Sequence, residues 1–215
     1  MQSGAAEAQT RQPDIFVSFV SFVDTSLSPP FSAVLLAGGR SSRMGRDKAG
    51  IVIAGQPLWQ KQLATLRATG ARELFISGKP DGAYADSGIE IIVDRTPGQG
   101  PLAGLEAALR RSTLPLLLVL AIDLPEMTSA FLADLVRRTS ASGLGIVPRA
   151  DQWFEPLAAI YPRACLPLIE ECLRGEDHSM QHFVREGAAQ NLVEERPLTP
   201  VEKKLFRNLN APEDL

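Results

Sequence analysis

The chain has 215 residues and a mass of 23.2 kDa, and its 22 basic against 25 acidic residues leave a net charge of −3. With 45% hydrophobic residues it can bury a full core, which excludes intrinsic disorder for most of its length. The slight acidity argues against a broad nucleic-acid-binding face, and the length fits one α/β domain without a second core.

The cysteines favour a reducing compartment, and the hydropathy argues against a membrane span. Cys165 and Cys172 are the only cysteines, without a Cys-x-x-Cys pair or a Cys/His array, so neither a disulfide framework nor a zinc site is indicated. The apolar run at residues 15–23 is far shorter than the ~20 residues that span a bilayer. It also lacks the flanking features of a secretory signal. We therefore expect a cytoplasmic protein with no membrane partner.

Residues 1–30 differ in composition from the rest of the chain. The first thirteen are small and polar, residues 16–23 alternate Phe or Val with Ser, and a Ser-Pro-Pro sequence closes the segment. We expect a loose N-terminal extension here. The alternative is that the alternating register forms an edge strand or a partner contact. The domain itself is expected over residues 31–215.

From residue 31 onward, strand-like and helix-like runs alternate, which is typical of an α/β domain with a largely parallel sheet. Short apolar runs rich in branched residues predict buried strands at 32–37, 74–76, 89–93, 116–120 and 144–147. Helical periodicity predicts helices at 57–69, 101–111, after Thr128 as N-cap, at 163–173 and at 181–186. The segments 157–161 and 205–209 are further candidates for strands at the sheet edge.

The loop after the first predicted strand, residues 37–48, gathers three glycines, three arginines and a lysine. Glycines let the backbone present N–H groups to an anion, and the cations offset phosphate charge. In open α/β sheets, ligands bind beyond the carboxyl ends of the strands, where this loop must lie. Its spacing matches neither GxGxxG nor GxxxxGK[ST]. Composition therefore leaves two alternatives, a phosphate-binding loop and a solvated basic turn.

Asp123 directly follows the apolar run at 116–121, so its carboxylate is expected near the carboxyl end of the sheet, within reach of the same loop. Mg²⁺ commonly takes one or two protein carboxylates and completes its octahedron with waters and substrate phosphates. Asp123 is therefore a candidate metal ligand. The alternative is a turn aspartate shortly before Pro125.

The segment LAGGRSSRMGRDK at residues 36–48 resembles the LAGG-x-S-x-RMG-x-DK signature of molybdenum cofactor guanylyltransferases, within the wider nucleotidyltransferase superfamily. Later segments match the family's motifs in order: GQPL at 55–58, Asp94 with GPLAG at 100–104, IDLP at 122–125, EPL at 155–157 before Tyr161, and FRNLNAPEDL at 206–215. The resemblance covers about residues 31–215. It implies a single three-layer, Rossmann-like α/β nucleotidyltransferase domain with a mostly parallel sheet.

Members of this family transfer GMP from GTP to the terminal phosphate of molybdopterin and release pyrophosphate. The resemblance implies GTP and the molybdenum cofactor as substrates and Mg²⁺ as the metal. Molybdoenzyme apoproteins or their chaperones are the implied protein partners, and no nucleic acid is expected. Arg43 and Lys48 would supply cations at the triphosphate and Asp123 the metal ligand. The backbone cradle would come from Leu36, Ala37, Gly38 and Gly39.

The same resemblance points to residues around the nucleotide. Asp94 matches a nucleotide-binding aspartate, so a guanine or ribose contact is expected, with a strand-terminal turn residue as the alternative. Gly100 and Gly104 would permit close approach of a ligand, although Gly-Pro also simply starts helices. Ser77 falls where relatives carry Asn beside the base. Because one hydroxyl cannot replace both the donor and the acceptor of an amide, the base contact stays open.

Two groups of residues have alternative roles. Asn208 and Asn210 approach the metal or the molybdopterin in one interpretation and pin the C-terminal turn in the other. Trp59 and Trp153 are expected to pack or to line a pocket wall rather than to stack on nucleic acid, because no broad basic surface accompanies them.

Three other functions compete with guanylyl transfer. The nearest is a CTP-dependent molybdenum cofactor cytidylyltransferase; those relatives usually show LAAG where this chain has LAGG, and the extra glycine favours the larger base. A sugar-phosphate nucleotidyltransferase is more distant. A non-catalytic protein that binds nucleotide or cofactor is the third, but binding alone would not require both Lys48 and Asp123.

Overall fold

A computed structural model describes residues 29–38, 48–96 and 98–209, except for the side chain of Lys48. Its main sheet has the order β10-β7-β9-β6-β1-β4-β5, with β8 paired to β7. The strands are β1 Phe31–Leu36, β4 Glu73–Ser77, β5 Glu90–Ile92, β6 Leu116–Ala121, β7 Gly145–Ala150, β8 Trp153–Phe154, β9 Ala158–Pro162 and β10 Val193–Pro197. Only β8 and β9 run antiparallel to their neighbours in this sheet, so the expected mostly parallel sheet is confirmed.

The helices begin and end where the sequence carries the appropriate signals. The α-helices are α1 Leu58–Arg67, α2 Pro101–Arg111, α3 Ser129–Ser142, α4 Leu166–Arg174 and α5 Met180–Ala189. Thr128 caps α3 as predicted, because its hydroxyl accepts the Phe131 N–H at 3.3 Å. Shorter elements are the hairpin β2 Val52–Ile53 with β3 Gln56–Pro57 and the 3₁₀ helices η2 Lys48–Gly50, η3 Ala85–Ser87, η4 Arg163–Cys165 and η5 Glu202–Phe206.

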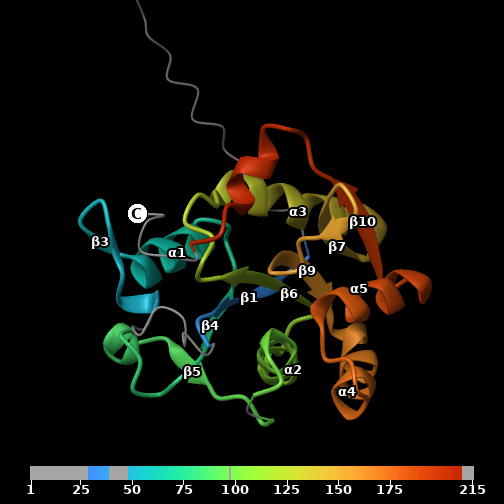
Figure 1. Cartoon of the computed structure of the whole chain (residues 1–215), viewed down its shortest axis with the longest axis horizontal. Helices are drawn as coiled ribbons and strands as arrows, with labels where there is room; N and C mark the ends of the chain where they lie inside the picture. Colours follow the sequence, from blue (N-terminus) through green and yellow to red (C-terminus); the bar gives the residue numbers. More distant parts are fainter. Residues whose placement is uncertain (1–28, 39–47, 97, 210–215) are drawn as a thin grey trace, which may run out of the picture.

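Alternate residues of the buried strands point to two separate hydrophobic cores, one on each face of the sheet. In β1, Ala33 and Leu35 pack with α1 and α3, whereas Val34 and Leu36 pack with α2, α4 and α5. Figure 1 shows α1 and α3 on one side of the sheet and α2 and α4 on the other. The result is the expected three-layer α/β architecture.

Two elements at the C-terminal end differ from the prediction. Residues 205–209 do not add a strand: η5 ends at Phe206, and Leu205, Phe206 and Leu209 instead cover the core beside α1 and α3. Phe206 stands edge-on to the Phe131 ring of α3, with centroids 5.4 Å apart. The edge strand is β10, which sequence patterning missed because three of its five residues are charged.

The predicted extension at residues 1–30 lies outside the described residues except for Pro29 and Pro30. In the part of the chain that the structure describes, no helix is both long and apolar enough to cross a membrane.

Candidate active site

Four neighbouring strands end at the same end of the sheet, which we call its carboxyl edge, or simply the edge. β6, β1, β4 and β5 are adjacent and parallel, so their carboxyl ends meet. Leu36 ends β1, Ser77 ends β4, and Asp94 and Asp123 each follow their strands, β5 and β6, by two residues. The structure thus brings together residues predicted from four separate segments, at the edge where open α/β sheets bind ligands.

The start of the glycine-rich loop is fastened to β4. The N–H groups of Ala37 and Gly38 both donate to the carbonyl of Ser77, at 2.8 and 2.9 Å. Both amides are therefore engaged within the protein. Phosphate binding by backbone amides of this loop is consequently expected from Gly39 onward, and Gly39 lies outside the described residues.

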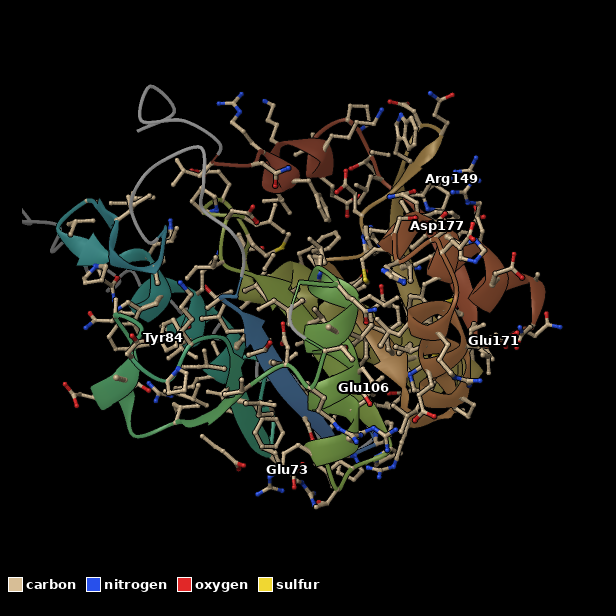
Figure 2. The ribbon with its side chains drawn as sticks, turned by 60° about the horizontal axis from the view of Figure 1, so that its bottom comes forward. Glu73, Tyr84, Glu106, Arg149, Glu171 and Asp177 are labelled. Atoms are coloured by element: carbon tan, nitrogen blue, oxygen red, sulfur yellow. The ribbon has the colours of Figure 1, made fainter. Side chains whose placement is uncertain are left out.

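A buried tyrosine supports the turn that follows β4. The Tyr84 hydroxyl accepts the Lys79 N–H at 2.8 Å, and a Cβ on Gly78 would lie only 2.0 Å from that hydroxyl. Gly78 in turn lies close to the start of the glycine-rich loop, since its Cα is 3.5 Å from the place of a Cβ on Gly38. Tyr84 therefore fixes the spacing of two glycine segments, a tertiary role that sequence reasoning missed. Figure 2 shows its position.

Ser77, Asp94 and Gly104 lie in mutual contact on the α2 side of the edge. The Ser77 hydroxyl donates to Asp94 Oδ1 at 3.3 Å. A Cβ on Gly104 would lie 2.6 Å from Ser77 Oγ, 3.3 Å from Leu36 Cδ2 and 3.5 Å from Asp94 Oδ1. Position 104 therefore has no room for a side chain. Ser77, predicted to lie beside the base, is buried and orients the Asp94 carboxylate.

The environment of Asp94 makes its charge costly. Burial raises the pKa of the Asp94 carboxyl, the hydrogen bond from Ser77 opposes this shift, and the carboxylate of Glu106 adds to it. Such a half-buried carboxylate gains from a ligand that donates hydrogen bonds to it, as a ribose hydroxyl or a guanine N–H does.

Gly100 shapes the start of α2. Its backbone has φ 70° and ψ −161°, a conformation that favours glycine, and Pro101 then begins the helix. No side chain caps this N-terminus. The start of α2 lies on the same side of the edge as Asp94, because a Cβ on Gly104 in its first turn would lie 3.5 Å from Asp94 Oδ1. A helix N-terminus favours an anionic group.

Asp123 lies in the middle of the edge and is partly exposed. The preceding residue, Ile122, donates its N–H to the Leu36 carbonyl at 3.1 Å, which joins the end of β6 to β1. The Asp123 carbonyl accepts the Leu209 N–H at 2.9 Å, so the C-terminal segment passes beside the backbone of Asp123. Asn208 is exposed in this segment.

The model of one protein family, described as the MobA-like NTP transferase domain, matches residues 33–192, well over half of the chain. The chain belongs to this MobA-like transferase family. It is 39% identical over 186 residues to an Opitutus terrae protein named "Probable molybdenum cofactor guanylyltransferase", with 85% of this chain and 92% of that protein covered. Family membership makes the chain a nucleotidyltransferase, and the family predicted from the motifs is confirmed.

Solved structures share the fold of this MobA-like transferase. The molybdopterin-guanine dinucleotide biosynthesis protein A from Archaeoglobus fulgidus superimposes with a TM-score of 0.69 at 23% identity, covering 85% of this chain and 94% of that one. The 4-diphosphocytidyl-2C-methyl-D-erythritol synthase from Anaerococcus prevotii reaches 0.64 at 12% identity, covering 86% and 92%. Because proteins named for different nucleotides share this fold, the fold alone does not choose the base.

Some predicted residues of the MobA-like transferase are not placed by the structure. Gly39, Arg43 and Asn210 lie outside the described residues, and Lys48 is described only as the first backbone position of η2. Within the described ranges, no group of three or more His, Cys, Asp or Glu side chains could hold a metal ion. A Mg²⁺ ion bridging a nucleotide requires only one or two protein carboxylates, and the part-exposed Asp123 fits that donor chemistry.

Proposed function

We propose that this MobA-like transferase moves GMP from GTP to the terminal phosphate of molybdopterin and releases pyrophosphate. The observation that carries the proposal is the 39% identity, over nearly the whole of both chains, to a protein named for molybdenum cofactor guanylyl transfer. The site geometry supports it, because Asp94 and Asp123, which follow β5 and β6, lie at the same edge of the sheet as the start of the glycine-rich loop.

The reaction joins two phosphates. A terminal phosphate oxygen of molybdopterin attacks the α-phosphorus of GTP, the bond from that phosphorus to the bridging oxygen breaks, and pyrophosphate leaves with the electron pair. Positioning and charge stabilisation account for most of such catalysis. Arg43 and Lys48 are proposed to offset the charge that develops on pyrophosphate.

Asp94 is proposed to bind the nucleoside of GTP. Its carboxylate is oriented by Ser77 and lies against Gly104, so the α2 side of the edge offers an acceptor for ribose or guanine donors. Gly100 precedes α2, and no side chain caps the N-terminus of this helix, whose dipole would stabilise an anionic group nearby.

Asp123 is proposed to hold Mg²⁺. When bound, this ion would neutralise phosphate oxygens and polarise the attacked phosphorus. The bonds from Ile122 to Leu36 and from Leu209 to Asp123 fix the backbone on both sides of this carboxylate. The partly exposed side chain therefore projects from a rigid support.

The compartment proposed for this reaction is the cytosol. Both cysteines are free and buried, with no disulfide between them, which suits a reducing environment.

Choice of nucleotide is the first test. Calorimetry with Mg²⁺ and purified protein, comparing GTP, CTP and ATP, is expected to show clear preference for GTP. Preference for CTP would move the chain to cytidylyl transfer with the same catalytic residues. Absence of binding by all three nucleotides would contradict the enzyme proposal.

Replacement of the proposed metal ligand tests the chemistry. Asp123→Asn preserves size and backbone bonding but removes the charge, so GTP-dependent pyrophosphate release with molybdopterin should fall roughly 10²–10³-fold. Glu126→Gln, an exposed carboxylate three residues further on, is the matched control and should retain wild-type turnover. Retained turnover in folded Asp123→Asn protein would show that Asp123 does not hold the metal.

A further inference from the structure

Glu155 places a second half-buried carboxylate at the edge of the sheet that carries Asp123. Strands β6 and β9 are antiparallel, and Leu120 and Ala158 form their last pair before this edge. Asp123 lies three residues after Leu120, and Glu155 lies three residues before Ala158, so both are the same number of residues beyond that pair. Because antiparallel neighbours lie about 4.8 Å apart, both carboxylates leave the sheet at the same edge. Glu155 therefore borders Asp123 on the side away from β1, β4 and β5.

The backbone around Glu155 is fixed, whereas its side chain has no polar partner within the described part of the chain. Its N–H donates to the Pro148 carbonyl at 2.7 Å, and the Leu157 carbonyl accepts the Ala121 N–H at 2.7 Å. The Gln181 side chain binds both the N–H and the carbonyl of the preceding residue, at 3.2 and 2.8 Å. Among the described residues, none forms a hydrogen bond or ion pair with the Glu155 carboxylate.

Trp153 presents its indole on the same face of this strand. The β7–β8 pairs Arg149–Phe154 and Ala150–Trp153 continue through the bond from Glu155 to Pro148, so the strand is extended here. Alternate residues then share a face, which places Trp153 and Glu155 together, about 6.6 Å apart along the strand. Phe154, between them, points to the other face and is buried in the core that contains α2, α4 and α5. The Trp153 side chain is 59% exposed, unusually open for so large an apolar group.

We propose that Trp153 and Glu155 bind the pterin ring system of molybdopterin, the indole stacking on the ring and the carboxylate accepting its paired N–H groups. This inference rests on the proposed function, which makes a pterin the acceptor. A pterin carries a ring N–H next to an exocyclic amino group, and the two oxygens of one carboxylate accept both. Its phosphate lies at the other end of the molecule, which suits a pterin site beside Asp123 rather than on it.

The environment of Glu155 suits this task. Burial raises the pKa of its carboxyl to about 7, and among the described residues no charged group contributes to that shift. A ligand that donates two N–H groups stabilises the ionised form and offsets the loss of water. A flat aromatic face next to that carboxylate adds stacking energy.

Kinetics on the full chain test the proposal, with GTP and Mg²⁺ saturating and molybdopterin varied. Glu155→Gln and Trp153→Ala should each raise KM for molybdopterin roughly tenfold or more, with the calorimetric Kd for GTP unchanged. Glu194→Gln, an exposed carboxylate on β10, is the control and should match wild type. A second readout uses Trp59→Phe protein, whose single tryptophan is Trp153. Pterin-6-carboxylate should quench its fluorescence saturably, and more weakly when Glu155→Gln is added.

The outcomes separate this inference from the proposed function. Wild-type KM for molybdopterin in both variants would overturn the pterin site, as would a change confined to the GTP Kd or to the Mg²⁺ requirement. If wild-type protein transfers no GMP to molybdopterin but pterin-6-carboxylate still quenches Trp153 saturably, the proposed function fails and the pterin site stands. Normal wild-type turnover without any quenching would overturn the pterin site alone.

Discussion

At position 104 the missing side chain determines how Ser77 and Asp94, the residues proposed to lie near the nucleotide, pack against α2. Gly104 lies in the first turn of α2, where Ser77 and Asp94 reach the helix backbone. Helix packing this close requires a residue without Cβ, and the Ser77 hydroxyl then fills the space and orients the carboxylate. The sequence motif contains Asp94 and Gly104, and Ser77 is a candidate because it stands where relatives carry Asn. The sequence does not predict the contact between the serine and the aspartate.

Gly104→Ala tests this arrangement at the scale of one residue. The new methyl group would displace Ser77 Oγ and press on Leu36, so the Kd for GTP should rise about tenfold and the free energy of unfolding should fall by about 1–3 kcal/mol. Calorimetry and urea denaturation measure both. Gly50→Ala is the control, because among the described residues its methyl group meets only Ala83 Cβ, at 3.9 Å. Unchanged GTP affinity in Gly104→Ala would contradict the role given to this contact.

Among the elements, Arg196 of β10 joins its strand to α3, which is distant in sequence, and to η5, which follows β10 closely. Its guanidinium contacts Glu202 of η5 at 2.6 Å and Asp134 of α3 at 3.1 Å, and it lies over the Phe131 ring at 4.9 Å. The hydrogen bond from Arg196 is the main cause that lowers the pKa of Glu202 to about 2. This cluster ties the charged edge strand to the C-terminal cover of the core.

Acid denaturation tests the cluster. Because the folded-state pKa of Glu202 lies below its ordinary value of 4.5, the associated stability is fully present above about pH 4.5 and is lost as pH falls toward 2. Arg196→Leu should lower the free energy of unfolding at pH 7 by about 1–3 kcal/mol and flatten its decline between pH 4.5 and 2. Urea titrations across this range measure the difference. An equally steep decline in the variant would show that Arg196 does not cause it.

An element could be predicted from the sequence when its own residues stabilise it, and could not when its stability comes from contacts with distant segments. Buried parallel strands such as β1 and β6 are continuous apolar runs, and α3 carries both its cap and its stripe, so local sequence indicates them. β10 is charged and depends on pairing with β7, and residues 205–209 are apolar because they cover a core rather than alternate in a strand. Contacts such as those of Tyr84 and Arg196 arise only once distant segments pack.

On the scale of the whole molecule, Asp123 divides the carboxyl edge of the sheet into two sides. The proposed nucleotide side comprises the ends of β1, β4 and β5 with the start of α2; the proposed acceptor side comprises the segment from β8 to β9. Figure 2 shows Tyr84 and Arg149, which border these two sides, toward opposite ends of the molecule. Such an arrangement lets each substrate be recognised independently while their phosphates meet at the proposed metal ligand.

Independence of the two sides makes a quantitative prediction. Asp94 follows β5 and Glu155 precedes β9, four strand spacings away in the sheet, which amounts to about 19 Å. Asp94→Asn should act on GTP and Glu155→Gln on molybdopterin, because within the described part of the chain the two side chains share no partner. The loss of transition-state stabilisation is calculated from the fall in kcat/KM for each substrate. In the double variant this loss should equal the sum of the two single-variant losses within about 0.5 kcal/mol. A coupling energy well above that value would mean that both carboxylates contact one substrate, and the division at Asp123 would be wrong.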